Sequence, residues 1–231
     1  MKLLAFETAT EACSVALWID GEVRERFEVA PRRHAELALP WADALLAEAG
    51  FARSQLDAIA VGRGPGAFTG VRLAVAITQG IALGLDRPVV PVSTLAALAL
   101  PARGARIAAA IDARMGEVYL GLFARDGDGL RALQPEAVLK PDSAQLPQGD
   151  IAWHGVGTGF AAGDGALRRR LHAQLHEVDA AALPHAADVA RLAALAWARG
   201  EAIAPERLEP AYLRDHVALT LAEQQAARAA R

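Results

Sequence analysis

An acidic residue occurs together with small residues in two short segments, each of which follows an apolar run. The first is ETAT at residues 7–10, and the second is DARMG at residues 112–116. Small side chains allow backbone N–H groups to approach phosphate oxygens, and a carboxylate can hold Mg²⁺ through water. Residues of these types are therefore compatible with phosphate and magnesium binding, and the fold decides where they lie.

The most distinctive stretch is glycine-rich, GRGPGAFTGVR at residues 62–72. No Lys-Ser or Lys-Thr pair follows its last glycine, so it is not the phosphate loop of P-loop enzymes. It leads into a helix expected at 71–85, with Thr69 as the expected N-cap. The clearly polar residues of that helix are Arg72, Thr78 and Gln79. Because a helix that is apolar on nearly all sides must be buried on more than one, its second side faces either this chain or a partner.

Histidines could supply metal ligands in two places. His34 opens a helix expected at 34–49, and we favour a helix-terminal or interface role for it. His172 and His176 would share one face of a helix expected at 160–172 if that helix continued. No third ligand lies near this pair in the sequence, so we favour a solvated helix end and predict no metal site. Cys13 lies beside an expected strand and is predicted to be a small buried residue.

The composition predicts a globular protein with a sizeable core, because 53% of the 231 residues are hydrophobic and 22% are charged. A net charge of −3 excludes nucleic-acid binding through overall positive charge, and a single cysteine excludes an internal disulfide. Residues 1–7 reach a carboxylate too early for a signal peptide, and no charge-free apolar run is long enough to span a membrane. We therefore expect a cytoplasmic protein without membrane contact.

Strand signals come in groups of three at two places in the chain, and α/β alternation follows each group. The expected strands are 2–7, 14–19 and 23–29, and then 106–112, 117–124 and 130–139. This duplication resembles the actin-like ATPase fold (ASKHA, ribonuclease H-like), an α/β fold of two subdomains with mixed sheets flanked by helices. The expected subdomains are 1–102 and a reduced 103–221, followed by a polar tail at 222–231.

The resemblance implies a place for a nucleotide between the two halves. The residues that match the phosphate and adenosine positions of such proteins are Glu7, Thr8, Thr10, Asp112, Gly155 and Gly157. The first turn of the fold usually carries Asp and a nearby Gly, whereas this chain has Glu7 and Ala9. Two interpretations stay open: weak binding of ATP or ADP with Mg²⁺, at the cleft or at the interface of a complex, and a degraded site inherited with the fold.

Four motifs, in order along the chain, resemble those of the TsaB family, formerly called YeaZ. They are GPGAFTGVRL at 64–73, PVSTL at 91–95, DARMGEVY at 112–119 and PAYLR at 210–214. The resemblance implies a non-catalytic relative of TsaD, the enzyme that transfers threonylcarbamoyl to a tRNA adenosine beside the anticodon. It also implies a scaffold that pairs with TsaD, helps recruit the ATPase TsaE, meets tRNA indirectly through the complex and requires no cofactor of its own.

The resemblance places the pairing on two helices of the first half, at about 34–49 and 69–85. The implied interface residues are His34, Leu37, Trp41, Phe68, Thr69, Arg72, Leu73, Ile77 and Ile81. Without TsaD, a second copy would cover the same face and give a homodimer. TsaD carries a His-x-x-x-His metal pair in its first half, whereas here His34 is followed by Ala38, so we expect no catalysis by this chain.

Two enzyme functions remain as alternatives. A small-molecule kinase of the same fold would need tight nucleotide binding and a catalytic carboxylate in the cleft. A metal-dependent, glycoprotease-like peptidase would need stoichiometric zinc or iron. The arginine run at 168–170 could contact tRNA phosphates, although such a run is more often a solvated helix face.

Overall fold

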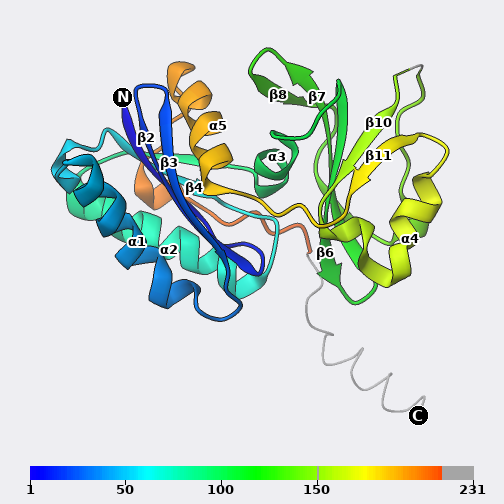
Figure 1. Ribbon diagram of the computed structural model, residues 1–231, viewed down its shortest axis with the longest axis horizontal. Coiled ribbons are helices and arrows are strands. Elements are labelled where there is room, and N and C mark those ends of the chain that lie inside the picture. Colours follow the sequence, from blue (N-terminus) through cyan, green and yellow to red (C-terminus); the bar gives the residue numbers. More distant parts are fainter. Residues whose placement is uncertain (150, 215–231) are drawn as a thin grey trace, which may run out of the picture.

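The computed structural model describes residues 1–149 and 151–214, which form two α/β lobes side by side (Figure 1). The sheet of the first lobe has five strands in the order β3-β2-β1-β4-β5. They are β1 (Lys2–Glu7), β2 (Ala12–Ile19), β3 (Glu22–Val29), β4 (Ala58–Gly62) and β5 (Val89–Val92). The sheet is mixed, because β1 pairs antiparallel with β2 and parallel with β4.

The second lobe repeats this arrangement. Its strands are β6 (Arg106–Arg114), β7 (Glu117–Asp126), β8 (Gly129–Ala132), β9 (Ala137–Leu139), β10 (Trp153–Val156) and β11 (Leu175–Asp179). The path β8-β7-β6-β10-β11 has the same order as the first sheet, and β9 pairs with β7 beside it. The first three strands are again antiparallel and the next two parallel. Two mixed sheets with one shared topology confirm the predicted α/β duplication.

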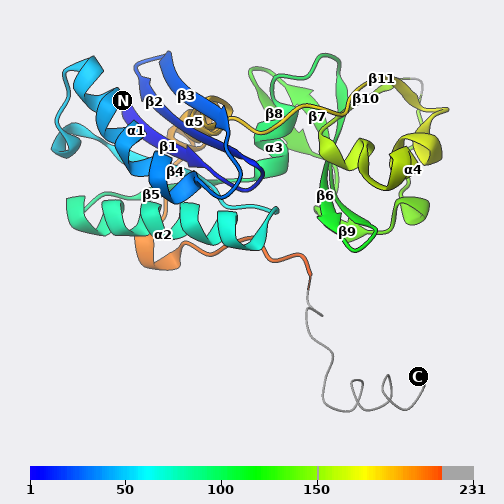
Figure 2. The same ribbon diagram turned by 60° about the horizontal axis from the view of Figure 1, so that its bottom comes forward.

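Among the described residues, five α-helices flank the sheets: α1 (His34–Ala49), α2 (Phe68–Leu85), α3 (Thr94–Ala99), α4 (Ala162–Leu171) and α5 (Ala186–Ala198). Short 3₁₀ helices occur at Arg53–Gln55, Pro141–Ser143, Thr158–Phe160 and Pro205–Arg207. In the first lobe α1 and α2 lie side by side on one face of the sheet, and α5 covers the other (Figure 2). Successive strand side chains point to opposite faces, so Leu4 and Phe6 pack toward α1 and α2 while Leu3 and Ala5 pack toward α5.

Helix α5 belongs to the first lobe although it follows the second sheet in sequence. Its residues Ala186, Val189 and Ala190 are fully buried, and the helix packs on β1, β2 and β4. A boundary near residue 102 does separate the two sheets, but the predicted range 103–221 also includes this first-lobe helix. Helical periodicity identifies a buried face but not the sheet that covers it. The predicted tail at 222–231 lies outside the described residues.

Two strand predictions differ from the structure. Residues 23–29 alternate between apolar and polar side chains, which predicts that Phe27 and Val29 share a buried face, but β3 is an edge strand and these residues are 37% and 54% exposed. Within residues 1–149 and 151–214 no second sheet covers this edge, and Phe27 instead stacks on His185, with ring centroids 4.1 Å apart. The strand expected at 130–139 is two short strands, because β8 and β9 pair separately with β7.

Candidate functional site

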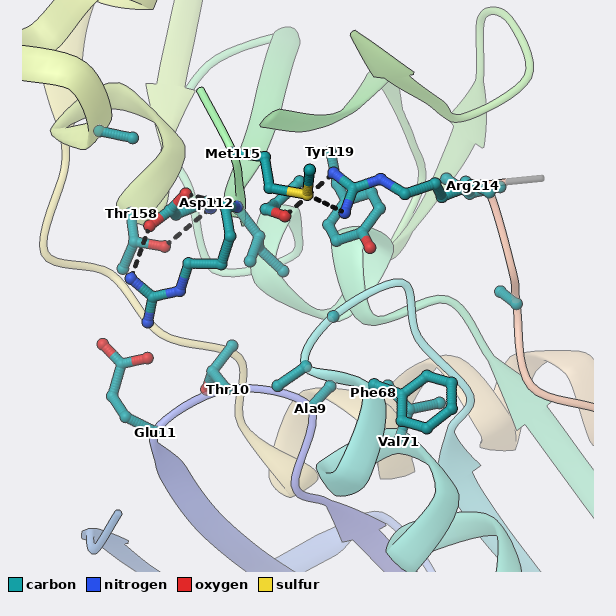
Figure 3. Close-up of a pocket in the computed structure, with 18 of the residues that line it drawn as sticks. Ala9, Thr10, Glu11, Phe68, Val71, Asp112, Met115, Tyr119, Thr158 and Arg214 are labelled. Carbon is teal, nitrogen blue, oxygen red and sulfur yellow. Dashed lines mark hydrogen bonds and ion pairs between the residues drawn. The ribbon is translucent and has the colours of Figure 1, made fainter. Parts of the chain in front are cut away.

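A cavity of about 1190 Å³ lies between the two lobes. Its walls come from the β1–β2 turn, the N-terminal end of α2, the β6–β7 hairpin and residues 211–214 (Figure 3). Of the residues predicted to bind a nucleotide, Thr10 and Asp112 line this cavity from opposite lobes. The predicted residues that do not line it are Glu7, Thr8, Gly155 and Gly157.

Glu7 is buried behind the cavity at the end of β1. Its carboxylate accepts hydrogen bonds from the N–H of Ala9 at 2.7 Å and from Thr94 Oγ1 at 2.8 Å. Burial raises the pKa of Glu7 to about 7, because desolvation of the charged form outweighs the hydrogen bonds that favour it. The N–H group of Ala9, which could have met a phosphate, is therefore already bound within the chain.

The glycine-rich loop packs directly against the same turn. Thr8 Oγ1 donates a hydrogen bond to the carbonyl of Gly70 at 2.7 Å. A Cβ atom at Gly70 would lie 2.0 Å from the Thr8 carbonyl oxygen, and one at Gly66 would lie 2.4 Å from the Ala9 carbonyl oxygen. The glycines thus allow two backbone segments to touch, and the Thr8 hydroxyl is used to hold them together.

The second predicted turn, between β6 and β7, reaches the cavity. The Asp112 carboxylate accepts hydrogen bonds from the N–H of Arg114 at 2.8 Å and from its guanidinium at 3.0 Å. Arg114 and Met115 have φ values of 63° and 56°, in the left-handed region that non-glycine residues rarely adopt. This backbone presents Met115 at the cavity wall with 84% of its surface exposed.

Gly155 and Gly157 serve packing inside the second lobe. A Cβ atom at Gly155 would lie 2.8 Å from the ring of Phe160. Gly157 has a φ of 103°, and a Cβ there would lie 2.3 Å from the carbonyl oxygen of Ala110. Both positions therefore require glycine for reasons internal to the fold.

Helix α2 carries most of the predicted partner-binding residues. Phe68, Thr69 and Arg72 are exposed, and Leu73, Ile77 and Ile81 are half-buried. Thr69 is not the N-cap, because the extended backbone ends at Ala67 and the helix begins at Phe68 without a side-chain cap. Leu83, which is 54% exposed, extends the apolar face and was not predicted. Helix α2 is long and apolar enough to cross a membrane, but the buried helices of globular cores often have the same length and composition. Its buried side packs on β4.

Two glycines lie on the exposed side of α2. Gly80 and Gly84 are one helical turn apart, and a Cβ atom built at either meets no atom within 4 Å. Ala76 lies one turn before them and is also exposed. Glycine inside a helix is less favourable than alanine by about 1 kcal/mol, so Gly80 and Gly84 lower helix stability without avoiding a clash among residues 1–149 and 151–214.

The predicted residues of α1 contribute less exposed surface. Leu37 and Trp41 are half-buried and pack against the core of the first lobe. The imidazole Nε2 of His34 lies 3.0 Å from the carbonyl oxygen of Thr10 and 3.2 Å from that of Ala12. His34 therefore ties the start of α1 to the β1–β2 turn and lines the cavity with its remaining surface.

The histidine pair of the second lobe does not share a helical face. Helix α4 ends at Leu171, and His176 lies on β11, because residues 175–179 pair in parallel with β10. The premise of an i, i+4 metal pair at His172 and His176 is therefore wrong. Across residues 1–149 and 151–214 no cluster of three or more His, Cys, Asp or Glu side chains is suited to a metal ion. Cys13 is fully buried, as predicted.

Tyr212 and Arg214, which are not among the predicted site residues, link the C-terminal segment to the cavity. Tyr212 accepts a hydrogen bond from Arg72 Nε at 2.6 Å, and Arg214 donates to Glu117 at 2.6 Å. These partners are 140 and 97 residues apart in the sequence. The motif at 210–214 contains both residues and could have drawn attention to them, but its sequence does not indicate which parts of the chain it contacts.

The chain matches known proteins over most of its length. A family model described as "TsaD: tRNA N6-adenosine threonylcarbamoyltransferase" matches residues 27–221. The tRNA threonylcarbamoyladenosine biosynthesis protein TsaB of Escherichia coli K12 is 44% identical over 94% of this chain and 96% of that protein. The TsaB protein of Haemophilus influenzae is 41% identical over 94% of this chain and 95% of that protein.

A solved structure has the same two-lobed architecture. It is a Pseudomonas aeruginosa protein described as similar to the peptidase YeaZ, with a TM-score of 0.87 and 47% identity over 92% of this chain and 99% of that chain. With the duplicated mixed sheets, this likeness supports the actin-like type of fold. The sequence matches and the shared structure show that the chain belongs to the TsaB (YeaZ) family.

Proposed function

We propose that this protein is a non-catalytic scaffold in the formation of threonylcarbamoyladenosine on tRNA, and that it acts by pairing with TsaD through α2. Its relatives are named as tRNA threonylcarbamoyladenosine biosynthesis proteins, which supports the pathway. In this proposal the pair helps recruit TsaE, meets tRNA only through the complex, and can hold ATP or ADP with Mg²⁺ at the cleft or at the complex interface. Alone, the chain forms a homodimer through the same face.

The observation that carries the pairing is the exposed strip of Ala76, Gly80 and Gly84. Two glycines in a helix interior lower its stability by about 1 kcal/mol each relative to alanine, and neither avoids a clash with any described part of the chain. Small residues allow the backbone of a second helix to approach closely, with larger side chains packing at the sides. Phe68, at the N-terminal end of α2, and Leu83, near its C-terminal end, supply exposed apolar surface for such packing.

The absence of catalysis in the proposal rests on the site chemistry. Ala38 is fully buried where the TsaD pattern needs its second histidine, four residues after His34. The carboxylate of Glu7 and the hydroxyl of Thr8 are occupied by contacts within the fold. Helix α2 also leaves a largely apolar face exposed, which suits binding rather than bond breaking.

The pairing is tested by Ala76→Arg, with Ala198→Arg as the matched control. Both alanines are exposed helix residues, but Ala198 ends α5, which covers the opposite face of the first sheet. Ile77 is a poorer probe, because it packs against the core of the first lobe. We expect Ala76→Arg to weaken TsaD binding in calorimetry at least tenfold and to convert the homodimer to monomer in analytical ultracentrifugation. Equal binding by both variants would reject α2 as the interface.

The scaffold role is tested by reconstitution. TsaD, TsaE, tRNA, ATP and threonylcarbamoyl-adenylate are combined with and without this chain, and the modified adenosine is measured by mass spectrometry. We expect modification to require the chain, while the chain without TsaD yields none. Equal modification in its absence would refute the function, and product from the chain without TsaD would make it an enzyme.

A further inference from the structure

We propose that residues 205–214, here called the strap, couple the pairing face of α2 to the separation of the two lobes. This inference rests on the proposed pairing and adds its regulation: a partner on α2 changes the cleft, and a change in the cleft alters pairing. The strap runs from the C-terminal half of α2, past its N-terminal end, to the second lobe, and its contacts form a continuous series.

The strap is first anchored along α2. Gln79 Nε2 donates hydrogen bonds to the carbonyl oxygens of Pro205 at 3.0 Å and Leu208 at 3.2 Å. Leu208 is 3% exposed and belongs to the hydrophobic core under α1 and α2. The N–H of Ala211 then donates to the carbonyl of Arg63, in the glycine-rich loop, at 2.8 Å. This part of the strap is therefore fixed to the first lobe and follows α2.

The next contact lies on the proposed pairing face itself. The guanidinium of Arg72 lies 3.4 Å from the ring centroid of Phe68, and its Nε donates to Tyr212 Oη at 2.6 Å. Phe68 and Tyr212 are both about half exposed, at 54% and 51%. A partner that packs on the N-terminal end of α2 must therefore contact Arg72 and Tyr212 together, and it acts on the strap directly.

The last contact reaches the second lobe. Arg214 Nη2 donates to the carbonyl oxygen of Ala113 at 3.1 Å and to the Glu117 carboxylate at 2.6 Å, so it binds both strands of the β6–β7 hairpin. Figure 3 shows Arg214 beside Met115 on one side of the cavity and Phe68 on the other. Only one residue separates Tyr212 from Arg214, so a displacement of Tyr212 is transmitted to the hairpin that carries Asp112 into the cleft.

The coupling has a thermodynamic consequence. If pairing favours one separation of the lobes, then a ligand that binds better at that separation strengthens pairing. By linkage, pairing strengthens the binding of that ligand by the same factor. The strap connects the pairing face of α2 with the cleft between the lobes. It is bound to the first lobe by Gln79 and to the second by Arg214.

The experiment measures the distance between the lobes with and without TsaD. Spin labels are placed on Glu22→Cys, at the exposed first residue of β3, and on Asp128→Cys, in the exposed β7–β8 turn. Cys13 does not compete for the label, because it is fully buried and burial raises its pKa to about 11. We expect TsaD to shift the distance distribution of the doubly labelled full chain, and Arg214→Ala to abolish that shift while TsaD still binds.

The matched control is Arg207→Ala, which removes an exposed arginine from the same strap; it should keep the full shift. Glu117→Gln removes the same ion pair from the hairpin side and should reproduce Arg214→Ala if that variant folds poorly. An unchanged distance on TsaD binding, or a shift retained in both ion-pair variants, would overturn the coupling while leaving the pairing intact. Failure of the parent chain to bind TsaD would instead reject the proposed function and the coupling with it.

Discussion

At the scale of single residues, Glu7 is a carboxyl group that serves the fold rather than a ligand. Its pKa rises from the usual 4.5 to about 7 on burial, so the folded chain holds a proton that the unfolded chain releases. The stability from this group is complete below pH 4.5 and is lost as the pH rises through 7. Glu7→Gln keeps the shape but cannot ionise, so we expect a flatter pH dependence and a free energy of unfolding at pH 8 higher by roughly 1–3 kcal/mol.

Urea unfolding between pH 5 and 8 measures this effect. Glu11→Gln is the matched control, because Glu11 lies four residues later on the exposed rim of the cavity. Its pH slope should remain that of the parent chain. Identical slopes for Glu7→Gln and the parent would show that Glu7 ionises in the folded protein as easily as in the unfolded one.

Glycines of the same helix should respond to alanine in opposite directions. A Cβ atom at Gly70 would lie 2.0 Å from the Thr8 carbonyl oxygen, so Gly70→Ala must push the start of α2 away from the β1–β2 turn. We expect it to lower the free energy of unfolding by about 2 kcal/mol or more. Gly80→Ala meets nothing within 4 Å and should raise it by up to about 1 kcal/mol. Thermal melts compare the two, and equal destabilisation would contradict the packing role of Gly70.

At the scale of elements, local patterns predicted what local interactions decide. The helix at 34–49 and the strand at 2–7 have the expected bounds. The wrong predictions concern choices made by distant neighbours. Residues 175–179 form a strand because β10 offers a parallel partner, although the sequence there allows a helix to continue.

The candidate site was predictable only in part for the same reason. Motif spacing located the turn at Asp112 and the apolar face of α2, because each lies within one segment. It could not show that Glu7 is covered by the glycine-rich loop, since that depends on close approach of residues far apart in sequence. Tyr212 and Arg214 became recognisable as part of the cleft only through contacts about 100 residues or more away.

Replacement of the exposed glycines of α2 should stabilise the isolated chain and weaken its pairing with TsaD. Gly80→Ala with Gly84→Ala removes two unfavourable helix residues, so we expect the melting temperature of the isolated chain to rise. The added methyl groups thicken the strip against which a partner helix packs, so TsaD binding should weaken. Calorimetry of TsaD binding and thermal melting, run on the same preparation, give the two readouts. A stabilised chain that binds TsaD as tightly as before would place the partner elsewhere.

At the scale of the whole molecule, the first lobe is completed by residues from the end of the described chain. Helix α5 covers the sheet face formed by residues such as Leu3, Ala5 and Val90, all fully buried. Residues 1–102 contain the whole first sheet but lack α5, so this fragment would expose that apolar face to water. We expect it to show no cooperative thermal unfolding and to bind a hydrophobic dye.

The complementary construction joins residues 1–102 to residues 181–214 through a flexible Gly/Ser linker. It restores α5 and the strap while leaving out the second sheet, so we expect a cooperative melt and loss of dye binding. Circular dichroism and dye fluorescence on both fragments distinguish two views of the molecule. A cooperative melt of residues 1–102 alone would mean that the first lobe folds without α5, so that the chain consists of two consecutive domains. Folding of the joined fragment only would show that the lobes interleave, so that the second lobe is an insertion into the first.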